Sequence, residues 1–192
     1  MLSYSELRVG TTFILDGDPY KVLEYNFLRM QQRKPVAQTK IKNLRTGKIV
    51  SRMFHQNESF QEADIEREKA FFLYTHRGEY WFRKPPSSAL TQKRFMLKDD
   101  ILGDAVHFLV PDTEIITDIF RGEIISIELP IKMDFKVKEA PPGVKGDSAQ
   151  GGSKEVVLET GYKITVPLFV NAGDVVRINT ETGEYVERLS KA

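Results

Sequence analysis

The sequence predicts an all-β protein made of small β-barrels or sandwiches, and two observations carry this prediction. Apolar and polar residues mostly alternate along the chain, as half-buried strands require. Runs of β-branched and aromatic residues are joined by glycine-centred turns from one end of the chain to the other. The length of 192 residues and the hydrophobic fraction of 41% allow one large domain or two or three small ones with packed cores.

The predicted hairpins follow one another along the chain, each with its turn at a glycine. The stretch "TTFILDGDPYKVLEYNF" turns at Asp16-Gly17-Asp18-Pro19, where glycine is free to take positive φ and proline presets the next φ. The stretch "VAQTKIKNLRTGKIVSRMF" turns at Thr46-Gly47. The stretches "FFLYTHRGEYWF", "DIFRGEIISIEL" and "RINTETGEYVERL" turn at Arg77-Gly78, Arg121-Gly122 and Thr182-Gly183.

Two stretches carry helical signals. Ser3 to Glu6 has the form of a capping box, but Gly10 follows soon after, so at most one turn is expected. The stretch "LKDDILGDAVHFL" has apolar residues at helical spacing, with Asp99 or Asp100 as the N-cap. Gly103 weakens that helix by about 1 kcal/mol relative to alanine. We therefore expect one short helix in an otherwise β-rich chain.

Shifts in composition divide the chain into three β-rich thirds, predicted as domains 1–64, 65–129 and 130–192. Small β-barrels of that size can fold alone, although their cores are thin. The stretch "APPGVKGDSAQGGSKE", residues 140–155, is the one long loop-like segment. It is either a linker or a functional loop, because long loops inside small domains are often functional.

The composition excludes several classes of protein. Cysteine is absent, which excludes disulfides, thiol catalysis and cysteine-ligated metals and fits a reducing compartment. The N-terminus lacks the pattern of a secretory signal, and no apolar run approaches the roughly 20 residues that span a bilayer. We therefore expect a cytoplasmic protein with no membrane partner.

The charge distribution is more informative than the net charge of +1. No acid occurs between Glu24 and Glu58, and eight cations lie in that window. They are Arg29, Arg33, Lys34, Lys40, Lys42, Arg45, Lys48 and Arg52. This predicts a local positive patch on a hairpin, and the alternative is a solvated hairpin face.

Signals for catalysis are weak. The three histidines are scattered without ligand spacing, and no nucleophile elbow is present. The stretch "GDSAQGGSK" fails the phosphate-loop pattern because Ser153 precedes Lys154. We therefore expect no catalytic residues, no metal and no cofactor. Nucleic-acid binding remains, since small SH3-like and OB-type barrels commonly bind RNA by shape and charge.

The C-terminal stretch "PPGVKGDSAQGGSKEVVLETGYKITVPLFVNAGDVVRINTETGEYVERL" resembles bacterial elongation factor P, and "VGTTFILDGDPYKVLEY" and "TKIKNLRTGKIV" resemble its first domain. The resemblance implies an SH3-like (KOW-like) barrel followed by two OB-fold barrels, arranged in an L shape. It also implies binding to the ribosome between the P and E sites, where the factor positions P-site peptidyl-tRNA and stimulates peptide-bond formation at consecutive prolines. The implied partners are both ribosomal subunits, their rRNA and P-site tRNA, without DNA, for a monomeric protein.

The resemblance places the tip of the first-domain hairpin at the acceptor end of the P-site tRNA. The gapless register puts the lysine that the family extends enzymatically on Gln32, so an unmodified tip is expected. The tip residues are Gln31, Gln32, Arg33 and Lys34, and Arg29, Lys40, Lys42 and Arg45 form the RNA-facing basic patch. Glutamine can still donate and accept hydrogen bonds, and the following cations keep positive charge at the tip.

The resemblance also assigns sites in the last third. A loop with Gly146, Asp147, Gly151 and Gly152 is expected to face the small subunit and the E-site codon region, and Tyr185 and Arg188 are expected to contact the small subunit and tRNA. From the residues alone these would be a flexible turn, a strand aromatic and a terminal cation. The alternative function, favoured by the divergent tip, is a general RNA- or single-strand-binding barrel protein without a role in peptidyl transfer.

Overall fold

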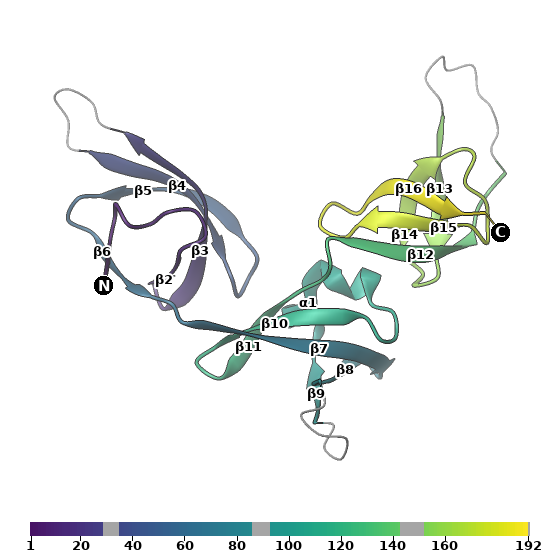
Figure 1. Ribbon diagram of the computed structural model, residues 1–192, viewed down its shortest axis with the longest axis horizontal. Helices are drawn as coiled ribbons and strands as arrows, with labels where there is room; N and C mark the ends of the chain where they lie inside the picture. Colours follow the sequence, from purple (N-terminus) through teal and green to yellow (C-terminus); the bar gives the residue numbers. More distant parts are fainter. Residues whose placement is uncertain (29–34, 86–92, 143–151, 192) are drawn as a thin grey trace. The chain divides into compact units, whose positions relative to one another are not determined.

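A computed structural model describes residues 1–28, 35–85, 93–142 and 152–191 of the chain (Figure 1). Its strands form three antiparallel sheets, and the described part contains one four-residue α-helix. This confirms the predicted all-β fold of three small barrels with one short helix.

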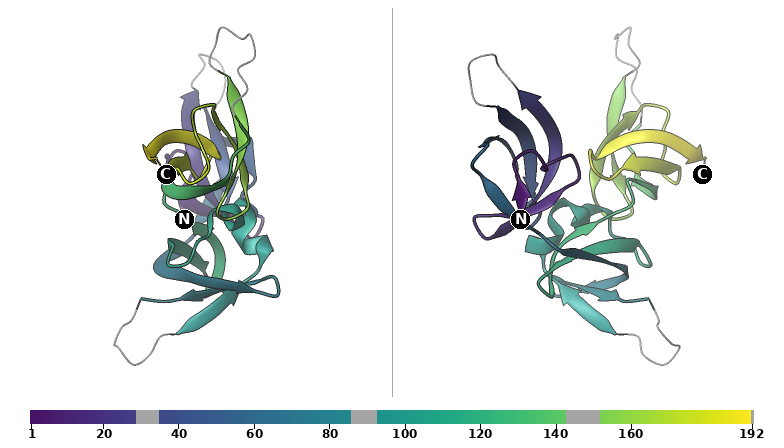
Figure 2. Two further views of the ribbon diagram at one scale, coloured as in Figure 1. Left: turned by 90° about the vertical axis from the view of Figure 1, so that its right-hand side faces the viewer. Right: turned by 60° about the vertical axis from the view of Figure 1, so that its left-hand side comes forward.

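The first sheet has six strands in the order β1-β6-β2-β3-β4-β5. Its strands are β1 (Leu2–Ser3), β2 (Thr12–Leu15), β3 (Asp18–Leu28), β4 (Val36–Asn43), β5 (Ile49–His55) and β6 (Ser59–Glu62). The strands curve (Figures 1 and 2) around a core that contains the buried rings of Phe13, Phe54 and Phe60. Phe13 lies 5.1 Å from Phe60 and 5.8 Å from Phe54 between ring centroids, both edge-on. Such edge-to-face pairs stabilise a core beyond the area that they bury.

The tightest hairpin turns place two successive residues at positive φ. At Asp16-Gly17 the φ angles are 53° and 92°, and Arg77-Gly78 and Arg121-Gly122 repeat this geometry. Two positive φ angles are typical of the type I′ turn, whose twist matches that of the strands which it joins. The turns predicted at Arg77-Gly78 and Arg121-Gly122 are confirmed, whereas the turn predicted at Asp16-Gly17-Asp18-Pro19 is confined to Asp16-Gly17, because Asp18 and Pro19 already belong to β3.

The second sheet has the order β11-β10-β7-β8-β9. Its strands are β7 (Ile65–His76), β8 (Glu79–Arg83), β9 (Arg94–Leu97), β10 (Glu114–Phe120) and β11 (Glu123–Glu128). Phe72 and Phe82 are buried on one face of β7 and β8, with ring centroids 5.4 Å apart. Because side chains alternate along a strand, their neighbours Phe71, Trp81 and Arg83 lie on the opposite face.

The helix between β9 and β10 is shorter than the sequence pattern predicts. It consists of α1 (Asp99–Leu102) followed by the 3₁₀ helix η1 (Gly103–Phe108), and Gly103 takes φ 52° where they meet. The predicted N-cap is wrong, because the N-cap is Lys98 and no side chain caps the helix. In the described part of the chain, no helix is long and apolar enough to cross a bilayer.

The third sheet has the order β14-β13-β12-β15-β16. Its strands are β12 (Lys132–Glu139), β13 (Ser153–Leu158), β14 (Lys163–Pro167), β15 (Val175–Asn179) and β16 (Glu184–Ser190). The strands curl (Figure 2, green to yellow) around a core of buried residues that includes Phe135 and Val176. The alternation of buried and exposed residues along β12 and β14 is the pattern that the sequence shows.

By its internal contacts the chain divides into two compact units. One consists of residues 1–68 and 117–127, and the other of residues 69–116 and 128–192. The domain boundaries predicted from the sequence and the L-shaped arrangement stay predictions.

Candidate nucleic-acid interface

The hairpin of β3 and β4 places a row of polar side chains on its outer face. Ala37, Thr39 and Ile41 of β4 are buried, whereas Gln38, Lys40 and Lys42 alternate with them and are exposed. The two strands pair as far as Leu28 opposite Val36. The tip residues Gln31, Gln32, Arg33 and Lys34, and Arg29 before them, lie outside the described residues.

The two described lysines of this face differ in their surroundings. The Lys40 ammonium lies 3.1 Å from the Glu24 carboxylate, and both side chains are largely exposed. Such a surface pair contributes at most about 1 kcal/mol and is screened by salt. Lys42 lies directly opposite Lys21 in the strand pairing. Like charges in that position repel each other, so an anion that contacts this face would relieve the repulsion.

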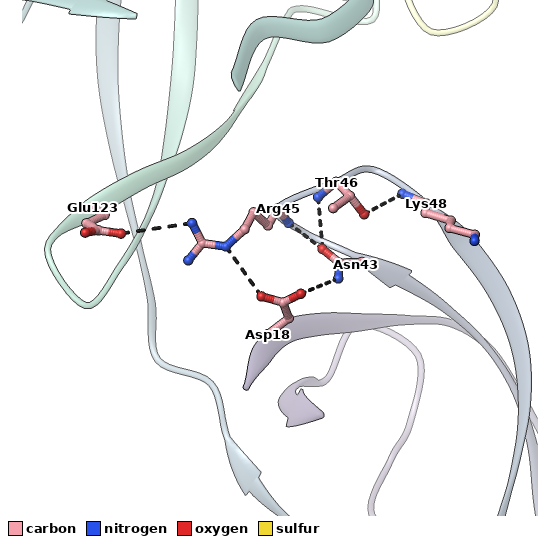
Figure 3. A network of polar contacts seen from close by, with 6 residues as sticks. All are labelled: Asp18, Asn43, Arg45, Thr46, Lys48 and Glu123. Atoms are coloured by element: carbon pink, nitrogen blue, oxygen red, sulfur yellow. Dashed lines mark hydrogen bonds and ion pairs between the residues drawn. The ribbon is translucent and has the colours of Figure 1, made fainter. Parts of the chain in front are cut away.

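Arg45 is held by acidic partners in the turn that follows β4 (Figure 3). Its Nε lies 3.4 Å from Asp18 Oδ1, and its Nη1 lies 4.0 Å from Glu123 Oε2. The structure therefore brings Lys40 and Lys42 together on one strand face, while the charge of Arg45 is shared with two carboxylates.

Two asparagines that build the turns of these sheets were missed at the level of sequence. The Asn43 side-chain oxygen accepts hydrogen bonds from the N–H groups of Arg45 and Thr46 at 2.8 and 2.9 Å, and its amide donates to Asp18 at 3.0 Å (Figure 3). Asn179 accepts the equivalent two bonds in its own turn at 2.9 and 3.3 Å. The repeated pattern N-x-x-T-G, in "NLRTG" and "NTETG", is the signal that could have identified them.

A groove in the third sheet brings together two of the residues predicted for the C-terminal site. It has a volume of about 590 Å³, and Gly152, Tyr185 and the strand β14 line it. Burial raises the pKa of the Tyr185 hydroxyl, and the charge of Arg188 opposes that shift. Gly146, Asp147 and Gly151 lie outside the described residues.

Gly152 occupies a position with little space for a side chain. A Cβ atom there would lie 3.0 Å from Leu168 Cδ1, and the Gly152 carbonyl accepts a hydrogen bond from the Leu168 N–H at 3.3 Å. The glycine thus lets the chain pass close to Leu168 at the edge of the groove.

We expect Gly152→Ala to destabilise the protein by about 1 kcal/mol, because the Leu168 side chain must move aside. Thermal unfolding monitored by circular dichroism measures the effect. The double variant Gly152→Ala/Leu168→Ala is the control, because Leu168→Ala removes the clashing atoms. In that background, the alanine at position 152 should lower the free energy of unfolding by less than it does alone. An equal cost of the alanine in both backgrounds would contradict a clash.

Arg188 is engaged within the third sheet. Its Nη1 donates to the Phe169 carbonyl at 2.9 Å and to Asp174 Oδ2 at 3.2 Å, and its guanidinium lies 4.7 Å from the centre of the Phe169 ring. The Asp174 side chain is only 3% exposed and also accepts the Asn171 N–H. The arrangement makes Arg188 the neutralising partner of a buried carboxylate.

The described residues contain no group of three or more His, Asp or Glu side chains that could hold a metal ion. His55 and His76 are exposed at strand ends, and His107 stacks on Tyr162 with 4.4 Å between ring centroids. The outer face of the β3–β4 hairpin offers exposed lysines, which suits contact with a polyanion.

Comparison with known proteins matches both ends of the chain to one family. A family model described as the elongation factor P (EF-P) KOW-like domain matches residues 3–60, and one described as elongation factor P, C-terminal, matches residues 133–188. An elongation factor P from Moorella thermoacetica is 41% identical over 188 residues, which cover 98% of this chain and 100% of that protein. One from Thermodesulfovibrio yellowstonii is 34% identical over 193 residues, covering 100% of both.

Among solved structures, the chain resembles a eukaryotic translation initiation factor 5A from Methanococcus jannaschii. The identity is 14% and the TM-score 0.48, over 67% of this chain and 90% of that one. The sequence relatives decide which family the chain belongs to, because they match over almost their whole length. The chain belongs to the elongation factor P family of translation elongation factors.

Proposed function

We propose that this chain binds the ribosome between the P and E sites, positions P-site peptidyl-tRNA and stimulates peptide-bond formation, above all at consecutive prolines. The observation that carries the proposal is the full-length match to curated elongation factors P. Contacts with both subunits and their rRNA, a monomeric state and a cytoplasmic location belong to the same proposal.

The physical basis of the proposed activity is positioning. The ribosome performs the chemistry, and the factor supplies no catalytic group of its own. When a poorly reactive peptidyl-tRNA is held in attack geometry, the entropy cost of orienting the reactants is met before the reaction begins. This lowers the free-energy barrier of the reaction. A rigid barrel that carries a hairpin is suited to this, because the sheet fixes the direction in which the hairpin projects.

Two surfaces are assigned to the contacts with RNA. The tip residues Gln31 to Lys34 are proposed to reach the tRNA acceptor end, and the exposed Lys40 and Lys42 on the same hairpin support this by adding charge for phosphates. The groove with Gly152 and Tyr185 supports a second contact, at the small subunit and the E-site codon region. Arg188 would act there by holding the neighbouring segment in place.

We expect the purified chain to co-sediment with 70S ribosomes that carry P-site tRNA and to accelerate synthesis through a run of prolines. A reporter that lacks the proline run serves as the control and should respond little. The measurement is full-length product against time in a reconstituted translation reaction. Absence of both co-sedimentation and stimulation would refute the proposal.

Membership of the family favours this role over general RNA binding. A general RNA-binding protein would bind free RNA and ribosomes in proportion to exposed phosphate, without a need for P-site tRNA. Removal of P-site tRNA from the ribosomes therefore separates the two functions. We expect it to weaken the association.

A further inference from the structure

The outer face of the second sheet carries a row of large side chains across three strands. Tyr74 of β7 is paired with Trp81 of β8, which is paired with Met96 of β9. Residues paired across antiparallel strands share a face. Tyr74 is 45% exposed and Met96 is 36% exposed, and the rings of Tyr74 and Trp81 lie nearly parallel with centroids 6.4 Å apart. The Tyr74 ring is thus open to solvent on the sheet, and Trp81 lies half-buried beside it.

A second row beside it combines an aromatic ring with two arginines. Phe71 of β7 is paired with Arg83 of β8, which is paired with Arg94 of β9. The Arg83 guanidinium lies 4.5 Å from the centre of the Phe71 ring, and its Nη2 lies 3.3 Å from a carboxylate oxygen of the exposed Asp112. Arg94 is exposed. Guanidinium groups and aromatic rings thus lie in neighbouring rows on one face of β7, β8 and β9.

Arg83 of β8 and Arg94 of β9 lie directly opposite each other, and Arg83 also pairs with Asp112. Between Glu79 and Asp99 the sequence holds five cations and no acid. Like charges in opposite positions destabilise a strand pair. A polyanion bound to this face would remove the repulsion.

We propose that this face of β7, β8 and β9 binds an unpaired strand of RNA, with bases stacked on Tyr74 and Trp81 and phosphates held by Arg83 and Arg94. Exposed aromatic rings between cations are how sequence-tolerant single-strand sites are built. Bases inside a duplex are already stacked on each other, so the rings select an unpaired strand. The surface adds to the proposed ribosomal role and does not depend on it.

The chain contains one tryptophan, which makes the proposal directly measurable. Because Trp81 lies within the proposed site, its fluorescence reports binding there and not at the β3–β4 hairpin. We expect an oligouridylate of about twelve nucleotides to quench Trp81 saturably in the full-length chain. An RNA duplex of the same length should quench much less.

Two variants test the assigned contacts. Tyr74→Ala should weaken binding about 5- to 150-fold through loss of one stacked base, whereas Tyr74→Phe should retain it. Arg94→Ala should reduce the slope of log affinity against log salt concentration by about 0.7, the value for one phosphate contact. Circular dichroism of each variant separates lost binding from lost folding.

A matched control lies on the third sheet. Lys132→Ala removes an exposed cation of β12. It should leave the Trp81 titration unchanged. The proposal is overturned if oligouridylate does not change Trp81 fluorescence, if Arg94→Ala and Lys132→Ala act equally, or if an acidic peptide of the same length quenches as strongly. If the chain stimulates translation through proline runs but shows no such quenching, only the present inference is refuted.

Discussion

The double variant Arg33→Ala/Lys34→Ala is expected to bind ribosomes and to lose most of the stimulation at proline runs. These cations follow Gln32, which has no amine to extend, so they carry the positive charge of the tip. A loss of roughly tenfold or more corresponds to about 1.4 kcal/mol of barrier, which is within the range of a single charge-assisted hydrogen bond. Peptide-bond formation on a proline-stalled ribosome measures the effect.

The matched control is Lys132→Ala/Lys138→Ala, which removes two exposed cations from β12 and should stimulate as the unaltered chain does. The reason is that these cations lie in the third sheet, far along the sequence from the tip. Both double variants must still co-sediment with ribosomes, so that a difference in stimulation reports on the tip and not on ribosome binding. Full stimulation by Arg33→Ala/Lys34→Ala would show that the tip assignment is wrong.

Removal of Arg188 is expected to destabilise the third sheet more than removal of any other single cation in it. Arg188→Ala removes the guanidinium that lies 3.2 Å from the Asp174 carboxylate, a side chain that is only 3% exposed. Breaking such a buried pair costs about 3–5 kcal/mol, and we expect about 2–3 kcal/mol because the arginine is itself about a fifth exposed. Urea unfolding followed by circular dichroism measures the change in the free energy of unfolding.

Arg177→Ala on the neighbouring strand is the matched control. Arg177 Nε lies 2.8 Å from Asp134 and its Nη1 lies 3.1 Å from Glu187, but both acids are exposed, so water replaces the lost contacts. We expect a cost of at most about 1 kcal/mol. The double variant Arg188→Ala/Asp174→Asn removes the buried charge and should recover part of the loss. Similar costs for Arg177→Ala and Arg188→Ala would contradict the role assigned to the buried carboxylate.

Hairpins were predictable because the signals that form them are local. The Asp16-Gly17, Arg77-Gly78 and Arg121-Gly122 dipeptides specify turns with positive φ, and alternation on either side specifies strands. The segment 99–108 was predicted less well. Its apolar spacing suits a helix, but Gly103 adopts φ 52° and divides it into a short α-helix and a 3₁₀ helix.

The candidate site was predictable in part. The row Lys40 and Lys42 follows from alternation along one strand. The partners of Arg45 did not follow, because Asp18 and Glu123 come from distant parts of the sequence. Trp81 was also missed, since the row that it forms with Tyr74 and Met96 depends on the register of three strands.

The sequence by itself determined the all-β class, the positions of the glycine turns and the family, because each depends on short stretches of neighbouring residues. Only the tertiary structure decided which charges are available to a partner. Nothing in the sequence distinguishes the surroundings of Arg188 from those of Lys42. In the structure, Arg188 neutralises the buried Asp174, whereas Lys42 is exposed and lies opposite Lys21. The physical reason is that burial and pairing depend on strands brought together by the fold, and spacing along one strand does not record them.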